Sequence, residues 1–199
     1  HNISFLQQKA YCLIETSQFL EATNLLESII DQNPETSFKM SAMLAHILSS
    51  ELRKGDNLFF LNSKISSNPD NLAWVLVKCK YFSYEHNYSE SIKIIEKNSQ
   101  LLNIIYFERE LAFCYEALHE NEKALHVYDK LIENNPNDHF SLFGRGQLHI
   151  SKRKYDLAKK DFEKAYLASK YVRYKLSIAY VLGIMGKYDD ALNVIEDCS

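Results

Sequence analysis

Cysteine and histidine are the residues of this chain most able to bind a metal or act as a nucleophile, and their spacing supports neither. His119 and His126 flank an expected turn, Cys114 precedes His119 by five residues, and no H-E-x-x-H sequence occurs. Metal sites and Cys–His nucleophiles need closely spaced or co-oriented ligands. We therefore interpret these residues as ordinary surface and core side chains.

Acidic and glycine residues give no catalytic pattern either. Glu108, Glu110 and Glu116 are typical of a solvated helix and do not define a pair of catalytic carboxylates. The segment GIMGK, with Gly183 and Gly186, is too short for a phosphate-binding loop and fits a helix end followed by a turn. We expect no enzyme activity, no metal, no cofactor and no small-molecule substrate.

Composition and charge indicate a folded protein. The chain has 199 residues, of which 46% are hydrophobic and 25% charged, and its net charge is −3. A small negative charge gives no general attraction to nucleic acid, which is not an expected partner. Apolar runs such as LSIAYVLGIMG are shorter than the ~18 to 20 residues of a membrane span, so no membrane insertion is expected.

The charge is unevenly distributed along the chain. Residues 1–138 carry 12 basic and 19 acidic side chains, and residues 139–199 carry 11 basic and 7 acidic ones. Part of the basic excess is the cluster SKRKYD at residues 151–156. Two interpretations stay open, namely ordinary solvated faces or a basic surface that meets an acidic partner or a nucleic-acid backbone.

The cysteines and the ends of the chain suggest its context. The absence of C-x-x-C pairs and the apolar neighbours of each cysteine predict buried, reduced thiols and a cytoplasmic, intracellular location; the four residues are Cys12, Cys79, Cys114 and Cys198. The chain starts and stops within helical patterns, so we expect it to be a fragment of a longer protein.

A repeat organises the whole chain. Pro34, Pro69 and Pro136 all follow asparagine and lie 35 and 67 residues apart, the second interval being nearly twice the first. The segments QFLEA, NYSES, ENEKA, KYDLA and KYDDA recur with the same spacing or twice that spacing. A period of 33 to 35 residues therefore predicts one repeat domain over residues 1–199, with units at 3–36, 37–71, 72–104, 105–138, 139–171 and 172–199.

Each unit is expected to contain two helices. Apolar residues recur at intervals of three and four, which is typical of amphipathic helices, and a short polar turn separates the two runs. Asn-Pro should end the second helix, since proline cannot continue a helix and disfavours helical geometry in the preceding residue. In the weakest unit, 37–71, the first helix is expected to run to Arg53.

This pattern resembles the tetratricopeptide repeats, in which W-x2-L-G-x2-Y is followed by A-x3-F and then P. The unit 105–138 matches it at six places and has Glu108 instead of tryptophan; the matching residues are Leu111, Ala112, Tyr115, Ala124, Tyr128 and Pro136. The unit 139–171 departs from the pattern at Arg145 and His149. The resemblance covers nearly the whole chain.

The resemblance implies an all-α fold, a right-handed α-solenoid of about six antiparallel helical hairpins. Small residues should lie where helices pack closely, because larger side chains would push the helix axes beyond the usual ~8 to 10 Å. Those positions are Ala10, Ala112, Gly146 and Ala179 in the first helices and Ala22, Ala124, Ala158 and Ala191 in the second helices.

In this family the first helices line a concave groove, and their outward positions usually bind partner segments. Carried over to this chain, the groove positions are Gln7, Tyr11, Lys80, Tyr84, Tyr106, Arg109, Phe113, Phe140, Phe143, Gln147, Arg173 and Tyr180. Aromatic residues and arginine dominate binding energy at interfaces. Part of this set could instead pack between neighbouring repeats.

The function that follows from the resemblance is a non-catalytic module that binds a protein or peptide in its groove. The alternative is a structural scaffold subunit of a large assembly or a homodimer, joined through solenoid ends and convex faces, with self-association as one outcome. The family's carboxylate clamp for chaperone C-termini is incomplete, because Phe113, Gly144 and Ser177 stand at clamp positions. Capture of such a terminus is therefore not expected.

Overall fold

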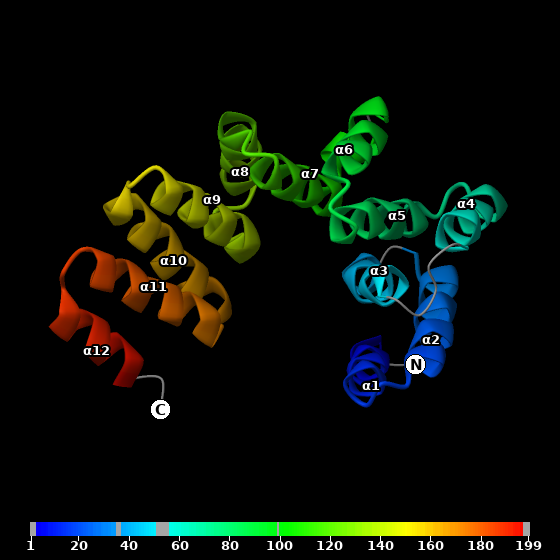
Figure 1. The fold of residues 1–199 in the computed structure, drawn as a ribbon, viewed down its shortest axis with the longest axis horizontal. Helices are drawn as coiled ribbons and strands as arrows, with labels where there is room; N and C mark the ends of the chain where they lie inside the picture. The colour runs from blue at the N-terminus through cyan, green and yellow to red at the C-terminus, as the bar shows by residue number, and fades with distance from the viewer. Residues whose placement is uncertain (1–2, 35–36, 51–55, 99, 197–199) are drawn as a thin grey trace. The chain divides into compact units, whose positions relative to one another are not determined.

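The computed structural model describes residues 3–34, 37–50, 56–98 and 100–196, and these ranges are helical with no β-strand (Figure 1). Twelve α-helices and two 3-10 helices are present in the described residues. The α-helices are α1 (Ile3–Glu15), α2 (Phe19–Gln32), α3 (Ser41–Ser49), α4 (Asn57–Ser67), α5 (Leu72–Tyr84), α6 (Tyr88–Lys97), α7 (Ile105–Ala117), α8 (Asn121–Asn134), α9 (His139–Ser151), α10 (Tyr155–Ser169), α11 (Val172–Ile184) and α12 (Tyr188–Glu196). The 3-10 helices are η1 (Ser37–Met40) and η3 (Leu101–Asn103).

The predicted fold class is confirmed, because the helices follow one another as hairpins of an α-helical repeat fold (Figure 1). Contacts divide the chain into a first unit, residues 1–110, and a second unit, residues 111–199. Each unit is described by itself below. The organisation as one domain with six repeat boundaries stays a prediction.

The Asn-Pro pairs end helices as the sequence predicts. Asn33, Asn68 and Asn135 are the C-cap residues of α2, α4 and α8, with φ of −136°, −136° and −141°. The proline that follows each one excludes helical geometry at the asparagine, and the chain leaves the helix there. The repeat 139–171 is one of those without proline, and its helix α10 ends differently, with Lys170 in the left-handed conformation at φ 59°.

The turns inside the hairpins share one backbone conformation. Ser17, His86, His119, Arg153 and Gly186 all have positive φ, between 55° and 75°, and their spacing follows the repeat. At each turn the next residue's amide donates a hydrogen bond of 2.8–2.9 Å to the carbonyl five residues back. This is the Schellman arrangement, which satisfies the carbonyls left over at a helix end. The chain therefore enters the second helix of each of these hairpins with the same backbone geometry.

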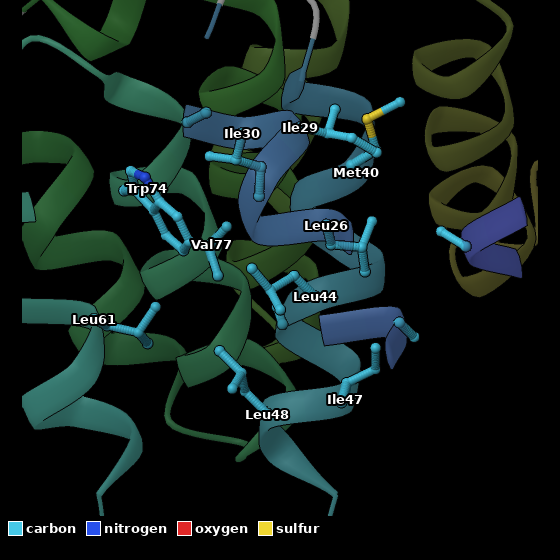
Figure 2. Packing of buried hydrophobic residues seen from close by; sticks show 14 residues of the cluster. Leu26, Ile29, Ile30, Met40, Leu44, Ile47, Leu48, Leu61, Trp74 and Val77 are labelled. Carbon is cyan, nitrogen blue, oxygen red and sulfur yellow. The ribbon is translucent and has the colours of Figure 1, made fainter. Parts of the chain in front are cut away.

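The core of the first unit lies between helices α1 to α5. Trp74 of α5 is fully buried, and its indole Nε1 donates a 2.8 Å hydrogen bond to Oδ1 of Asp31. Figure 2 shows buried side chains of α2, α3, α4 and α5 that form one cluster with this ring. Those from α2 are Leu26, Ile29 and Ile30, those from α3 are Leu44, Ile47 and Leu48, and Leu61 and Val77 come from α4 and α5.

A polar residue joins the repeats of the first unit. Asn71 is buried at the N-terminus of α5, where its Oδ1 accepts a hydrogen bond from the amide of Ala73. Its Nδ2 donates a 2.8 Å hydrogen bond to the carbonyl of Ile30, near the end of α2. One side chain therefore satisfies backbone groups at the ends of two helices, which otherwise lack partners.

Helix α3 is shorter than the sequence predicts. It ends at Ser49 rather than running to Arg53, because Ser50 leaves the helix with ψ 155°. The hydroxyl of Ser49 donates to the carbonyl of His46, and that of Ser50 donates to the carbonyl of Ile47. Serine side chains compete in this way with the backbone bonds of a helix. Arg53 itself lies outside the described residues.

The eight small packing positions are buried, as predicted. In the second unit a Cβ at Gly146 of α9 would stand 2.5 Å from Cε1 of Phe162 on α10. A Cβ at Gly144 would overlap the ring of Tyr128 on α8. Helix α9 therefore touches aromatic rings of both neighbouring helices at points where it has no side chain.

One prediction about the cysteines is wrong. Cys79 and Cys114 are buried, as predicted, but Cys12 is exposed. Cys12 and Cys114 stand two residues after the packing alanines Ala10 and Ala112. Because α1 packs mainly against α2, its equivalent of the Cys114 position has no covering helix. Cys198 lies outside the described residues.

The glycine contacts predict opposite effects of the same substitution at two helical sites. Gly146→Ala should lower the free energy of unfolding by about 1–3 kcal/mol through overpacking against Phe162. Gly183→Ala is the matched control, because nothing lies within 4 Å of its added Cβ. It should raise stability by up to about 1 kcal/mol, the helix preference of alanine. Urea unfolding measures both, and equal effects of the two changes would contradict the packing argument.

Candidate functional site

The residues predicted to line a groove lie on the first helices of their hairpins, and none of them is fully buried. We call the accessible side of these first helices the first-helix face. The exposed members are Tyr11, Tyr84, Phe113, Phe140, Gln147, Arg173 and Tyr180. The half-buried members are Gln7, Lys80, Tyr106, Arg109 and Phe143.

In the first unit an ion pair occupies part of this face. The Nζ of Lys80 lies 2.6 Å from Oε2 of Glu110, and the hydroxyl of Ser83 donates a 2.5 Å hydrogen bond to Oε1. Glu110 is only 3% exposed, so its interpretation as a solvated carboxylate is wrong. Lys80 neutralises a buried charge and thereby ties α5 to α7, which leaves it less available to a partner.

Two other carboxylates of α7 also differ from the prediction. Glu108 is 6% exposed and stands at the tryptophan position of the family pattern. Glu116 is half-buried and accepts a 3.2 Å hydrogen bond from the hydroxyl of Tyr128. Burial raises the pKa of the Glu116 carboxyl above its usual range.

Aromatic residues of the first unit combine packing with exposure. The ring of Tyr106 stacks on Phe38 at 5.1 Å, and the guanidinium of Arg109 lies 5.9 Å from the Tyr106 ring centroid. Tyr84 is 44% exposed and its ring lies 5.4 Å from that of His46. Tyr106 is therefore partly a packing residue, which was the open alternative, whereas Tyr84 presents its ring to solvent.

In the second unit the first-helix face contains an arginine above an aromatic ring. The guanidinium carbon of Arg173 on α11 lies 4.4 Å from the ring centroid of Phe143 on α9. Phe143 in turn packs against Phe162 at 5.5 Å and Tyr174 at 5.2 Å. Cation–π contacts of this kind hold the cation in place. Adjacent first helices thus share one aromatic and cationic surface.

A buried ion cluster lies on the opposite side of α9. Arg145 donates two hydrogen bonds to the carboxylate of Asp161, 2.8 and 2.7 Å long, and one of 2.8 Å to Oδ1 of Asp129. Asp161 is 3% exposed. The hydrogen bonds to Asp161 hold the pKa of Arg145 above its usual value. This cluster joins α8, α9 and α10 by charge-assisted bonds.

His149 belongs to the same cluster. Its Nε2 lies 3.6 Å from Oδ2 of Asp161, and its Nδ1 is buried without a hydrogen-bond partner among the described residues. Burial lowers the pKa of His149, and the positive charges of Arg145 and Lys154 lower it further, while Asp161 opposes the shift. The two departures from the family pattern, Arg145 and His149, are therefore parts of one interaction.

The basic segment 151–156 is partly neutralised. The Nζ of Lys152 forms an ion pair of 2.5 Å with Oε1 of Glu122 on α8. Exposed pairs of this kind contribute little stability, and Glu122 is exposed. The ion pair with Glu122 favours the interpretation of Lys152 as part of an ordinary solvated face. The side chains of Arg153 and Lys154 stay exposed at the turn.

Sequence reasoning missed one exposed residue of the first-helix face. Leu176 on α11 is 50% exposed and lies 33 residues after Phe143, at the equivalent repeat position. Adding a repeat period of 33 residues to the position of Phe143 gives Leu176.

No group of three or more histidine, cysteine, aspartate or glutamate side chains is arranged to hold a metal ion within the described ranges. Over the same ranges, every helix is too short or too polar to cross a membrane. The first-helix face, with its exposed aromatic side chains, is therefore the candidate functional site.

The helical hairpins and this face define a class, the α-helical repeat proteins. Two family models described as tetratricopeptide repeat match residues 110–138 and 141–170. These two segments are therefore tetratricopeptide repeats, and the helical hairpins on either side of them have the same α-helical repeat fold. The resemblance seen in the sequence is confirmed.

Solved structures share the fold at low sequence identity. A thermophilic TPR protein of Thermus thermophilus is 14% identical with a TM-score of 0.66, covering 90% of this chain and 98% of its own. PilF of Pseudomonas aeruginosa is 13% identical with a TM-score of 0.63, covering 96% and 87%. Human IFIT1, solved as a dimer with PPP-AAAA, is 20% identical with a TM-score of 0.65, covering 90% and 45%. No curated protein sequence matches the chain.

The ion cluster predicts a pH dependence of stability. Because the folded-state pKa of His149 is lowered, the unfolded chain binds a proton more readily than the folded chain below about pH 6.5. The stability contributed by neutral His149 is therefore present above that pH and lost as the pH falls through it.

His149→Gln should flatten this loss, as measured by urea unfolding at pH 7.5, 6.5 and 5.5. The matched control is His126→Gln, which removes an exposed histidine of α8 and should leave the pH profile unchanged. A profile of His149→Gln that parallels the wild-type profile would contradict the shift.

Proposed function

We propose that this chain is a non-catalytic module that binds a segment of a partner protein on its first-helix face. The tetratricopeptide repeats that it contains support a protein-interaction role in general. The observation that carries the proposal for this chain is the exposure of large aromatic side chains on first helices. Tyr180 is 61%, Tyr11 59% and Phe140 53% exposed, and the helices of Tyr180 and Phe140 have several buried residues.

Such exposure favours binding because aromatic side chains contribute most of the energy at protein interfaces. A ring that is already held by a structured helix loses little conformational freedom when a partner covers it. Lone exposed apolar residues are common on proteins, but a recurring set on equivalent helices is a candidate surface.

A second candidate is a structural subunit that contacts its neighbours through second helices. One observation favours it, namely three exposed apolar residues on α12. Tyr188, Leu192 and Ile195 are 68%, 57% and 46% exposed and lie four and three residues apart, on one side of the helix. Self-association through this side belongs to the same alternative.

The test is affinity capture of partners with the wild-type chain, followed by binding measurements on variants with the captured protein. Tyr180→Ala should weaken binding roughly tenfold to thirtyfold, the usual effect of removing an aromatic anchor. It should leave helix content unchanged, because the ring is exposed. Phe143→Ala is a poorer probe, since Phe143 also packs against Phe162 and Tyr174.

The controls are Lys160→Ala on the exposed side of α10 and Leu192→Ser on α12. Lys160→Ala should leave the affinity within about twofold of wild type. Loss of binding in Leu192→Ser with full binding in Tyr180→Ala would overturn the proposal and support the subunit alternative.

A further inference from the structure

The two neighbouring first helices of the second unit, α9 and α11, contain no aspartate or glutamate. The acidic residue next to them is Asp138, the N-cap of α9, which is 1% exposed. Its carboxylate accepts hydrogen bonds from the amide of Phe140 and the hydroxyl of Ser141. The accessible surface of these helices therefore carries no negative side chain.

The basic side chains around these helices contact different groups. Arg145 is bound to Asp161 and Asp129. Lys170 and Lys175 have their Nζ atoms 5.0 and 5.8 Å from the ring centroid of Tyr166 on α10. One guanidinium, that of Arg173, lies over a ring of α9.

Arg173 has a geometry suited to a carboxylate. Its guanidinium lies 4.4 Å from the Phe143 ring centroid, and no acidic side chain of the described residues forms an ion pair with it. A guanidinium over a ring face keeps its N–H donors in the plane of the group, where they can bind a carboxylate through two hydrogen bonds. The contact with Phe143 restricts the side chain before any ligand arrives.

Exposed apolar side chains lie on the same sides of α9 and α11 as Phe143 and Arg173. Leu176 and Tyr180 follow Arg173 by one and two turns on the same side of α11, and both are at least half exposed. Phe140 precedes Phe143 by one turn on α9 and is 53% exposed. We call these five residues the α9–α11 shelf.

We propose that the α9–α11 shelf binds an internal segment of a partner protein in which an aspartate or glutamate stands next to an aromatic or branched aliphatic residue. The carboxylate binds Arg173, and the apolar side chain packs on Phe140, Leu176 or Tyr180. The inference rests on the proposed function and adds the chemistry of the partner to it.

A nucleic acid is a poorer fit to this shelf. Binding a phosphate backbone takes several cations in a row, and the shelf has one. A single carboxylate beside an apolar side chain matches both the charge and the exposed rings.

The experiment is selection of a random dodecapeptide library on the whole chain. The enriched peptides are synthesised with both ends blocked, so that no terminal carboxylate can bind. Their affinities are then measured by fluorescence anisotropy for the wild type and for Arg173→Gln, Arg173→Lys and Lys160→Gln. Circular dichroism checks that each variant keeps its helix content.

The expected result is enrichment of peptides with an acidic residue within two positions of an aromatic or branched aliphatic one. Arg173→Gln should weaken them at least tenfold, Arg173→Lys should weaken them less, and Lys160→Gln should change affinity by less than twofold. Replacing the peptide's acid by its amide should weaken binding to the wild type and cause no further loss on Arg173→Gln.

Four results would overturn the inference. Enriched peptides without acidic residues, or peptides that bind Arg173→Gln as well as wild type, would refute it and leave the proposed function standing. Absence of any enriched peptide would refute both. Binding of a single-stranded dodecamer of adenylate that is lost in Arg173→Gln would assign the shelf to nucleic acid instead.

Discussion

The close approach of helices at positions without a large side chain is the constraint on which this structure depends. Helix α9 contacts Phe162 at Gly146 and Tyr128 at Gly144, and the equivalent first-helix positions elsewhere are the buried residues Ala10, Ala112 and Ala179. Close contact on the packed sides of a first helix leaves its remaining side accessible. The aromatic residues of that side are therefore exposed by the same geometry that builds the core.

The arginines on the two sides of α9 differ in whether carboxylates bind them. On the packed side, Arg145 binds two carboxylates, of which Asp161 is buried, and a buried charge without a partner would be strongly destabilising. On the accessible side, the guanidinium of Arg173 lies over the ring of Phe143 and forms no ion pair with an acidic side chain of the described residues. An unmatched charge at an accessible site costs little in water and is available for recognition. This contrast distinguishes the stabilising arginine from the one suited to a partner.

The repeat, the helical hairpins and the Asn-Pro helix ends could be predicted from the sequence, because period and proline geometry are local properties. The burial of Glu110 could not, since it depends on Lys80 and Ser83, about one repeat away. Helix α3 ended early because of serine hydroxyl bonds that apolar periodicity does not report. Among the groove residues, sequence spacing found the right helices, whereas only side-chain packing separates Tyr106, stacked on Phe38, from the exposed Tyr180.

Backbone amide chemical-shift mapping with the tightest selected peptide tests the central claim most directly, namely that the first-helix face is the binding surface. The claim predicts that the largest shift changes in the second unit fall on α9 and α11, around Phe140 to Gln147 and Arg173 to Tyr180. Amides on the exposed sides of α10 and α12 should change little. Largest changes on α10 or α12, with α9 and α11 unaffected, would contradict it.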